Sequence, residues 1–545
     1  MSEPNYSRRD FLESIGHLAG GSAVYRAALA LGLTGATTAC GSSSASDNNA
    51  TGAAAAATPN TNAPASGPFV SPVDWPPGVG TGKSVTILGA GIAGMTTAYE
   101  MNSLGYTCTL LEATTKAGGR CQTIRAGDVI EETDSTQVCN FDADDSLYFN
   151  PGPARISHHH VNLLRYCRNF NVSLEPFIND NRAALLHQTN AFDGAPQTAR
   201  QVKADLRGYI AALLTDAANS GALDAQLSTE DRENLTAMLK EFGALDAAGN
   251  YSGSSRNGFI ESPDQEPNRQ TIVPALSLSA ILSSDYWRFQ TTFAEEINQQ
   301  ASMLQPVGGM DRIAAAFEQR VQDLIHYSSI VSAIRKTDNG VRIEYLDGAG
   351  NSSSIESDYC VCTIPATVLA NIAADFSADH QQAIDNFVYT KATKMAFQSR
   401  RFWEQDHNIY GGISWTDQGI TQIWYPNNDF GSQQGIVVGA YTYSNSAGQR
   451  FADMNPTARL ETATTEGTQM HQEYGDEVTQ GISVSWPKIP YQKGAWGASD
   501  PGVLITADGN IYFAGEHLSI LQGWQEGAIL SAYHAINGIV GIDNG

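Results

Sequence analysis

The sequence predicts an α/β fold built on a Rossmann-type βαβ unit, and two neighbouring patterns carry this prediction. A β-branched strand at 85–88 breaks into the glycine-rich turn 89–94 and continues as a helix over 95–104. A second strand at 107–111 ends at Glu112, about 20 residues after the glycines, where this fold places a carboxylate for a ribose hydroxyl. The pattern therefore predicts a site for a dinucleotide.

Each position of the turn that holds a glycine needs it for a physical reason. Gly89 permits the tight turn, Gly91 lets a pyrophosphate approach the backbone, and Gly94 lets the helix pack on the strand. The N-terminus of the helix supplies amide donors and the positive end of a dipole. A glycine-rich turn beside an exposed glutamate is the alternative, but the strand, the spacing and the acid together favour the dinucleotide site.

Composition limits the size and the partners of the protein. A chain of 545 residues exceeds one ordinary hydrophobic core, so we expect two or three domains. The hydrophobic content of 42% is that of a globular protein. The formal net charge of −25 repels nucleic acid and anionic membrane surfaces before any contact forms, so neither is expected as a partner.

No metal site is expected from the sequence. The seven cysteines contain no C-x-x-C pair, and we expect most of them to be buried thiols. His158, His159 and His160 invite a metal interpretation, but consecutive helical residues point about 100° apart and cannot converge on one ion. We therefore interpret these histidines as the solvated start of a helix.

The N-terminal segment 1–40 has the layout of a twin-arginine export signal. Arg8 and Arg9 precede a weakly hydrophobic stretch rich in alanine and glycine, and this export route carries folded proteins. A chance arginine pair before a small amphipathic helix is the alternative. Cys40 stands in a sequence similar to a lipoprotein cleavage site, and 41–67 has the composition of a disordered linker. Export predicts a periplasmic or extracellular protein, with a lipid anchor if Cys40 is modified.

The pattern of elements after the first βαβ unit predicts two further domains. From about 191 to 300 the pattern is helical, with Ser228 placed to cap an amphipathic helix. Alternating apolar and aromatic residues at 389–402 and 413–443 predict a mixed sheet, and a hairpin over 330–346 belongs to the first domain. The expected ranges are 80–135, 302–388 and 500–545 for the dinucleotide-binding domain, 140–190 and 389–499 for the mixed-sheet domain, and 191–301 for an inserted helical domain.

Four further segments decide which dinucleotide is expected. They are Lys-Ala-Gly-Gly-Arg at 116–120, Gln-Pro-Val-Gly-Gly-Met-Asp at 305–311, Tyr-Phe-Ala-Gly-Glu-His at 512–517 and Gly-Trp-Gln-Glu-Gly-Ala at 523–528. With the glycine turn they resemble the flavin amine oxidase family, and within it the L-amino-acid oxidases. The resemblance implies FAD as the cofactor, and it makes the first two domains an FAD-binding domain and a substrate-binding domain.

The resemblance also implies which residues hold FAD. Ala495 stands where monoamine oxidases carry the cysteine that is tethered to the flavin, so FAD is expected to bind without a covalent link. The expected cofactor-binding residues are Gly89, Gly91, Ile92, Ala93, Gly94, Glu112, Ala113, Gly119, Arg120, Gly152, Pro153, Ala154, Arg155, Val331, Glu516, Gly523, Trp524, Gln525, Glu526, Gly527 and Ala528.

Within the family, Arg155 favours a resemblance to the amino-acid oxidases. In that branch the arginine of a Gly-Pro-x-Arg segment receives the substrate carboxylate, and Gly-Pro-Ala-Arg stands at 152–155. A guanidinium binds a carboxylate through two parallel hydrogen bonds, which fixes the α-carbon as well as holding the charge. An arginine paired with a structural acid is the alternative interpretation.

Other residues complete the substrate site that the resemblance implies. Tyr441 resembles the tyrosine that meets the substrate carboxylate, and Lys394 resembles the lysine that holds a water at flavin N5. Trp496 and Trp524, with Gly523, resemble the residues that flank the substrate. The aromatic residues could equally belong to the core, and Lys394 could be a surface lysine at the end of a strand. The expected catalytic residues are Lys394, Arg155, Tyr441 and Trp524.

The expected reaction is the oxidation of an L-amino acid, with a hydrophobic or aromatic preference or a broad one, by hydride transfer from Cα to flavin N5. Hydrolysis of the imino acid gives a 2-oxo acid and ammonia, and oxygen reoxidises the flavin with release of hydrogen peroxide. Two alternatives stay open: an amine or polyamine oxidase, which has no need of Arg155, and a flavin-dependent amino-acid 2-monooxygenase, which releases an amide. The expected assembly is a homo-oligomer, a dimer.

Overall fold

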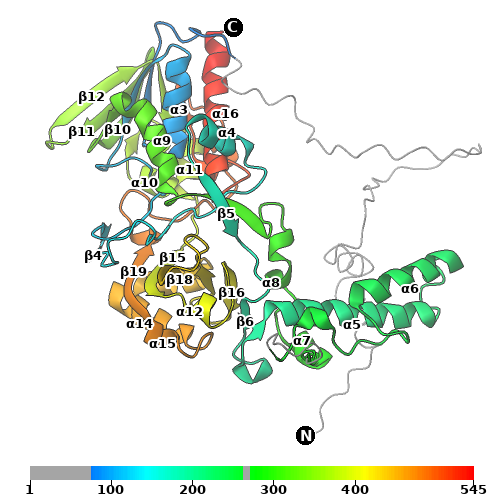
Figure 1. Cartoon of the computed structure of the whole chain (residues 1–545). Helices are drawn as coiled ribbons and strands as arrows, with labels where there is room; N and C mark the ends of the chain where they lie inside the picture. Colours follow the sequence, from blue (N-terminus) through cyan, green and yellow to red (C-terminus); the bar gives the residue numbers. More distant parts are fainter. Residues whose placement is uncertain (1–74, 262–269, 545) are drawn as a thin grey trace, which may run out of the picture. The chain divides into compact units, whose positions relative to one another are not determined.

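The computed structural model describes residues 75–261 and 270–544, and a five-stranded parallel sheet organises the first domain (Figure 1). In spatial order its strands are β20 (Ile511–Phe513), β13 (Tyr359–Cys362), β1 (Ser84–Leu88), β2 (Thr107–Leu111) and β9 (Ile325–His326). Because all neighbouring strands are parallel, their carboxyl ends meet at one edge, where the glycine turn follows β1.

The helix after the glycine turn begins earlier than predicted. α3 spans Ile92–Ser103, whereas the sequence pattern placed the start at Met95. Its first turn approaches the strand closely because Gly94 has no side chain: a Cβ there would lie 1.9 Å from the carbonyl oxygen of Gly89. The last glycine of the turn therefore belongs to the helix and serves its packing on the sheet.

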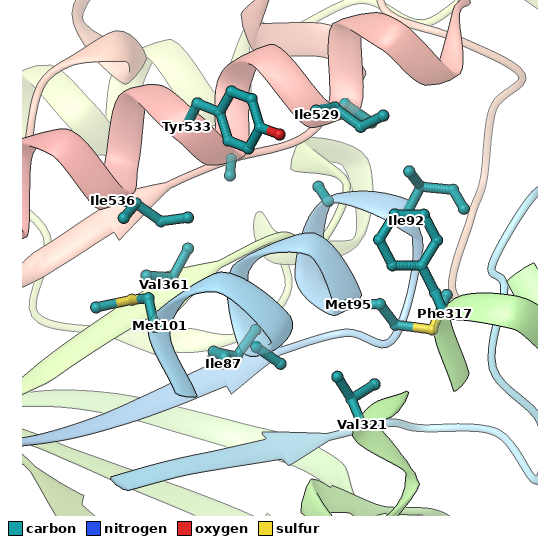
Figure 2. Packing of buried hydrophobic residues seen from close by; sticks show 14 of the residues in the cluster. Ile87, Ile92, Met95, Met101, Phe317, Val321, Val361, Ile529, Tyr533 and Ile536 are labelled. Carbon is teal, nitrogen blue, oxygen red and sulfur yellow. The ribbon is translucent and has the colours of Figure 1, made fainter. Parts of the chain in front are cut away.

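Two further helices pack against α3 and close the core of this domain. α9 spans Asp311–Val321 and α16 spans Gln525–Asp543. Figure 2 shows apolar side chains of the three helices meeting above the sheet, among them Met95, Phe317 and Ile529, all fully buried. Burial of such apolar surface is the main favourable term that holds the helices to the sheet.

One carboxylate joins the C-terminal helix to the strands of the sheet. Asp543, the last residue of α16, accepts hydrogen bonds from the hydroxyl groups of Tyr106 (2.8 Å) and Tyr359 (2.7 Å). Both tyrosines are buried. The bond to Tyr106 connects residues that are 437 positions apart in the sequence.

A four-stranded sheet extends the first domain. The predicted hairpin at 330–346 is confirmed, because its two strands pair in antiparallel fashion around a turn at residues 338–339. In spatial order the strands are β12 (Ser352–Ser357), β11 (Gly340–Leu346), β10 (Ile330–Thr337) and β14 (Ala373–Ala374), and the neighbouring helices are α10 (Ala366–Leu369) and α11 (Ala378–Asp385).

A seven-stranded mixed sheet carries side chains of the site described below (Figure 1). Its strands come from both sides of the helical segment in the sequence. In spatial order they are β19 (Val478–Ser485), β15 (Thr393–Arg400), β18 (Gln434–Thr442), β17 (Gln422–Tyr425), β16 (Gly412–Thr416), β6 (Leu185–His187) and β7 (Gln197–Thr198). The helices of this part are α12 (Phe402–Gln405), α13 (Asn445–Asp453), α14 (Pro456–Gly467) and α15 (Tyr474–Glu477).

Helices dominate the segment between the two parts of this sheet. Ser228 caps α6 as predicted: its hydroxyl accepts a hydrogen bond from the N–H of Asp231 (3.1 Å), whose carboxylate accepts one from the N–H of Ser228 (3.3 Å). The helices are α5 (Ala199–Asn219), α6 (Thr229–Gly243), α7 (Leu278–Ser283) and α8 (Phe289–Thr292). The remaining elements are α4 (Val161–Asn169) and the paired strands β3 (Val129–Glu132) with β4 (Ser135–Val138) and β5 (Leu174–Ile178) with β8 (Ser302–Pro306).

Three predictions concern the N-terminal part of the chain. The export signal at 1–40, the lipidation site Cys40 and the linker at 41–67 lie outside the described residues. Within the part of the chain that the structure describes, no helix combines the length and the apolar character needed to cross a bilayer. The cysteines of this part are buried free thiols, as predicted.

Candidate active site

A cavity of about 720 Å³ lies at the carboxyl end of β1. The glycine turn and the end of β2 line one region of it, and side chains of the seven-stranded sheet line another. Every residue that the sequence analysis assigned to the site lines this cavity, except Gly94, Glu526 and Gly527. A volume of this size suits a cofactor and a small substrate together.

The three residues that do not line the cavity have packing roles. The Glu526 carboxylate accepts hydrogen bonds from the N–H groups of Asn162 (3.2 Å) and Leu163 (2.8 Å) and from the Asn162 side chain (2.7 Å). These donors belong to the first turn of α4, so Glu526 satisfies the free amides at the start of that helix. Gly94 packs on the strand, and a Cβ on Gly527 would lie 2.3 Å from a backbone oxygen.

The glycine turn offers space and donors to a pyrophosphate. Gly91 is the N-cap of α3, and no side chain caps this helix. A Cβ added to Gly91 would meet no protein atom within 4 Å, so the backbone here is open to the cavity. The free amides of the first turn and the positive end of the helix dipole attract an anion. The turn therefore fits the diphosphate of a dinucleotide.

Glu112 follows the last residue of β2 and lies at the cavity wall. Its Oε2 atom accepts a hydrogen bond from the N–H of Ala90 (2.8 Å), and its Oε1 atom accepts from the N–H (2.9 Å) and the hydroxyl (2.8 Å) of Thr114. These bonds fix the carboxylate beside the glycine turn. A carboxylate has about four lone-pair sites, so capacity remains for a ribose hydroxyl to donate to it.

One ion pair organises the loops that carry the two predicted tryptophans. Arg120 Nη1 donates to Glu516 Oε1 (2.7 Å) and to the carbonyl oxygen of Ala495 (2.7 Å). The Glu516 carboxylate also accepts hydrogen bonds from the N–H groups of Gly523 (2.7 Å) and Gly497 (3.2 Å). In the sequence, each of these glycines is next to a tryptophan that lines the cavity. Glu516 therefore positions both aromatic rings.

Arg155 places a cation among aromatic rings. Its guanidinium carbon lies 4.5 Å from the ring centre of Trp424, 5.6 Å from that of Phe293 and 6.0 Å from that of Trp524. Its Nε atom donates a long hydrogen bond of 3.3 Å to the side-chain oxygen of Gln299. The Arg155 guanidinium therefore packs against the faces of aromatic rings, which attract cations through their quadrupole.

The charge of Arg155 has no counter-ion within the described part of the chain. No carboxylate there forms an ion pair with its guanidinium, so the interpretation as an arginine held by a structural acid finds no partner. Burial lowers the pKa of Arg155 to about 10, and the group stays charged at pH 7. A buried charge of this kind is costly unless a ligand supplies the opposite charge.

Lys394 is a buried residue of β15, and the alternative of a surface lysine is wrong. Its Nζ atom donates hydrogen bonds to the carbonyl oxygens of Gly152 (2.7 Å) and Asn150 (3.3 Å) and lies 4.9 Å from the ring centre of Trp424. Burial, and secondly the charge of Arg155, holds the pKa of Lys394 well below its usual range.

The sequence analysis missed Trp424, which contacts all three polar groups at this end of the cavity. Its ring packs against Arg155 and Lys394 and lies edge-to-face with Tyr441, 5.2 Å between centres. A signal was present, because Trp424 and Tyr425 are neighbours in β17. Successive residues of a strand face opposite sides of the sheet, and here the tryptophan faces the cavity.

The prediction of a solvated helix start is wrong for His160. His158 is exposed, whereas His160 is fully buried and packs edge-to-face against Trp524 with 4.9 Å between ring centres. Burial, more than the charges of its histidine neighbours, lowers the pKa of His160 to about 3, so the ring is neutral at pH 7. The start of α4 lies against α16, and this contact removes the ring from water.

The relatives of the chain include oxidases of amino acids. The chain is 27% identical to the flavin-dependent L-tryptophan oxidase RebO of Lentzea aerocolonigenes, over 84% of its own length and 98% of that protein. It is 26% identical to the L-amino-acid oxidase of Notechis scutatus scutatus, over 83% and 86% of the two chains. It is also 26% identical to the L-amino-acid oxidase of Siganus canaliculatus, over 86% and 87%.

Solved structures share the fold at lower identity. Putrescine oxidase bound to putrescine has a TM-score of 0.56 at 15% identity, over 84% of this chain and 99% of that chain. Cyclohexylamine oxidase from Brevibacterium oxydans IH-35A has a TM-score of 0.55 at 16% identity, over 84% and 99%. Likeness at this level shows the fold alone. The sequence profile of flavin containing amine oxidoreductases matches residues 92–539, and the chain therefore belongs to this family of flavin-dependent oxidoreductases.

Proposed function

We propose that the chain oxidises L-amino acids, with FAD bound non-covalently as its cofactor and oxygen as the electron acceptor. The products are a 2-oxo acid, ammonia and hydrogen peroxide. FAD, when bound, supplies the hydride acceptor and the site at which oxygen is reduced. The glycine turn, the start of α3 and Glu112 would hold its diphosphate and ribose, as their geometry permits.

The main support for an amino-acid substrate is that the buried charge of Arg155 has no counter-ion among the described residues. A substrate carboxylate supplies the missing counter-ion and takes two parallel hydrogen bonds from the guanidinium. A simple amine brings no anion and leaves the buried cation uncompensated, which costs free energy. The relatives named as L-amino-acid and L-tryptophan oxidases support the same class of substrate.

The side chains of the cavity bind and orient such a substrate. Arg155 fixes the carboxylate, and burial raises the pKa of Tyr441, so its hydroxyl keeps the proton that it can donate to the same group. The rings of Trp424, Trp496 and Trp524 line the cavity, where they enclose an apolar side chain and exclude water. An amino group that binds in its neutral form needs no side-chain base.

Peroxide release from a panel of L-amino acids and their decarboxylated amines tests this proposal. We expect oxidation of L-phenylalanine and L-tryptophan and little oxidation of phenylethylamine, because the amines cannot neutralise Arg155. Faster oxidation of the amine than of its amino acid would identify an amine oxidase instead. An amide product without peroxide would identify a 2-monooxygenase.

Acid denaturation of the yellow purified protein is expected to release all of its flavin. Ala495 offers no thiol, and Cys121, which lines the cavity, donates a hydrogen bond from Sγ to the Met310 carbonyl oxygen (3.1 Å). Burial raises the pKa of Cys121 to about 12, and a protonated thiol is a poor nucleophile. Absorbance of the supernatant after centrifugation measures the release, and chromatography identifies the flavin as FAD. Colour that stays with the precipitate would contradict the prediction.

We further propose that 1–40 directs export of the folded protein by the twin-arginine route. Changing both Arg8 and Arg9 to lysine is expected to retain the enzyme in the cytoplasm, because this signal is read by a receptor that requires the arginine pair. Cell fractionation followed by immunodetection and a peroxide assay measures the distribution. Arg26→Lys, in the stretch after the pair, is the matched control and should be exported normally. Normal export of the double variant would refute the proposal.

A further inference from the structure

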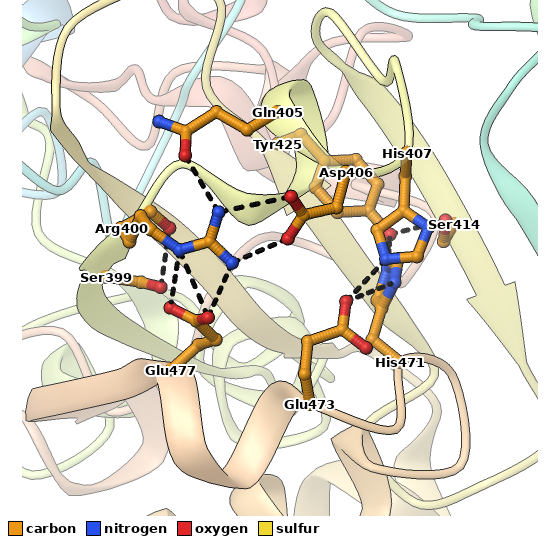
Figure 3. Close-up of polar contacts among 10 residues, drawn as sticks. All are labelled: Ser399, Arg400, Gln405, Asp406, His407, Ser414, Tyr425, His471, Glu473 and Glu477. Atoms are coloured by element: carbon orange, nitrogen blue, oxygen red, sulfur yellow. Dashed lines mark hydrogen bonds and ion pairs between the residues drawn. The ribbon is translucent and has the colours of Figure 1, made fainter.

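Two imidazoles and one carboxylate form a cluster apart from the active-site cavity (Figure 3). His407, His471 and Glu473 each offer one ligand atom, and these atoms all lie within 4.8 Å of one another. Glu473 Oε1 is hydrogen-bonded to His407 Nε2 and lies 4.0 Å from His471 Nδ1. None of the three residues lines the cavity described above.

His471 presents to this cluster a buried nitrogen without a hydrogen-bond partner. Its side chain is fully buried, and no described residue forms a hydrogen bond with its Nδ1 atom. The other nitrogen, Nε2, is hydrogen-bonded to the Tyr425 hydroxyl (2.6 Å), which is in turn hydrogen-bonded to Ser414 Oγ (2.7 Å). A neutral imidazole carries a proton on one ring nitrogen and a lone pair on the other.

The hydrogen bonds of His471 are compatible with a free lone pair on Nδ1. If Nε2–H donates to the Tyr425 oxygen and the Tyr425 hydroxyl donates to Ser414, both contacts are satisfied. At 4.0 Å from Glu473 Oε1, Nδ1 is too distant to form a hydrogen bond with this carboxylate. In this tautomer the ring aims a lone pair at the region beside the Glu473 carboxylate, an arrangement that attracts a cation.

The arginine beside the cluster does not supply this cation. Arg400 Nη2 lies 2.5 Å from Asp406 Oδ2 and 2.6 Å from Glu477 Oε1, and Figure 3 shows its guanidinium between these two acids. Within the ranges that the structure describes, no lysine or arginine forms an ion pair with Glu473. Among the described residues, the basic side chains beside the Glu473 carboxylate are therefore those of the two histidines.

We propose that His407, His471 and Glu473 bind one divalent transition-metal ion, for which Zn²⁺ is the best match. Zinc accepts two imidazoles and a carboxylate with a water in the fourth position, at about 2.0–2.2 Å. Tetrahedral bonds of this length place ligand atoms roughly 3.4 Å apart, and the three ligand atoms of the cluster lie within 4.8 Å of one another. Mg²⁺ and Ca²⁺ prefer oxygen ligands, so the imidazole pair disfavours both. When Nδ1 binds the ion, Nε2–H of His471 donates to the Tyr425 hydroxyl oxygen, the kind of outer bond that orients metal-binding histidines.

The ion has a structural role, because it joins segments on the side of the sheet away from the active site. His407 follows α12, and the other two ligands lie between α14 and α15. Tyr425, which orients His471, is next to Trp424 in β17, and successive residues of a strand face opposite sides. The ion therefore fixes the loop after α12 to the turn before α15 and takes no part in the oxidation.

Zinc binding to the tag-free holoenzyme tests this proposal. After treatment with a chelator, Zn²⁺ alone is titrated while bound metal and the Tm are measured. The parent is expected to bind about one Zn²⁺ per chain at this site and to gain a few degrees in Tm at saturation. His407→Gln and Glu473→Gln should bind Zn²⁺ at least 10–100-fold more weakly and lose the gain in Tm.

Two matched variants separate loss of a ligand from loss of charge or of any histidine. Asp406→Asn removes an acid bound to Arg400, and His534→Gln removes an exposed histidine whose ring is bonded to the Ile505 carbonyl oxygen. Both should bind Zn²⁺ as the parent does. The side chains of His407 and Glu473 are 36% and 30% exposed, so their variants should fold, which flavin absorbance checks. Unchanged affinity in the ligand variants, or a parent that gains no stability with excess Zn²⁺, would show that the proposal is wrong.

Discussion

Replacing Arg155 with methionine is expected to lower kcat/KM for L-phenylalanine by roughly 30-fold to several thousandfold, which corresponds to about 2–5 kcal/mol. The change leaves the substrate carboxylate without a cation in a cavity walled by the rings of Trp424 and Trp524. Desolvation of an unpaired charge accounts for most of this loss. Initial rates of peroxide release over a range of substrate concentrations measure it.

Arg155→Lys separates the charge from its geometry. It should recover part of the lost activity, because an ammonium keeps the charge but lacks the paired donors that orient the α-carbon. Flavin absorbance should be unchanged in both variants, and oxidation of phenylethylamine should change little. If the methionine variant kept its flavin and oxidised L-phenylalanine as well as the parent, the amino-acid substrate would lose its principal support and an amine oxidase would take its place.

Replacing Lys394 with methionine is expected to slow the reaction of the reduced enzyme with oxygen by about 10²–10³-fold. The ammonium lies in a water-poor cavity, where a fixed positive charge stabilises the negative charge that develops on oxygen. Rapid mixing of the reduced enzyme with oxygen measures this step. Anaerobic reduction by L-phenylalanine measures the other half-reaction, which should change less.

The lowered pKa of Lys394 gives the reaction with oxygen a pH dependence of defined sign. The charged form exists below that pKa and is lost as the pH rises through it, so the rate with oxygen should fall with rising pH in the parent. Lys394→Met should show no such fall. Lys391→Met removes an exposed lysine bonded to Gln449 and should keep the parent profile. The same fall in parent and Lys394→Met would contradict this role.

The parts of the fold that short patterns determine could be predicted from the sequence. The strand before the glycine turn, the strand that ends beside Glu112, and the hairpin at 330–346 each depend on residues close together in the chain. The same holds for the cap at Ser228. The start of α3 was misplaced because glycine is a poor helix former. Gly94 is nevertheless helical, because the helix packs closely on the strand at this residue.

The missed features depend on contacts between distant segments. Glu526 stands inside a recognised motif, yet its carboxylate serves the amide of Leu163, 363 positions away. His407 and Glu473 are 66 positions apart, so no periodicity window contains both. In the sequence, Trp424 cannot be distinguished from the other aromatic residues of the predicted sheet. Its contact with Arg155 arises only in the folded chain.

The bond between Tyr106 and Asp543 has a consequence for synthesis of the protein. These residues are 437 positions apart, and at about 5–20 residues per second the ribosome needs roughly 20–90 s to travel from one to the other. During this time α3 lacks α16, and the apolar side chains that α16 covers stay open to water. Loops of this length close slowly, because their entropy is lost before the contact is gained. The nascent N-terminal half therefore exposes apolar surface during synthesis, and a chain that stops before residue 525 keeps that surface exposed permanently.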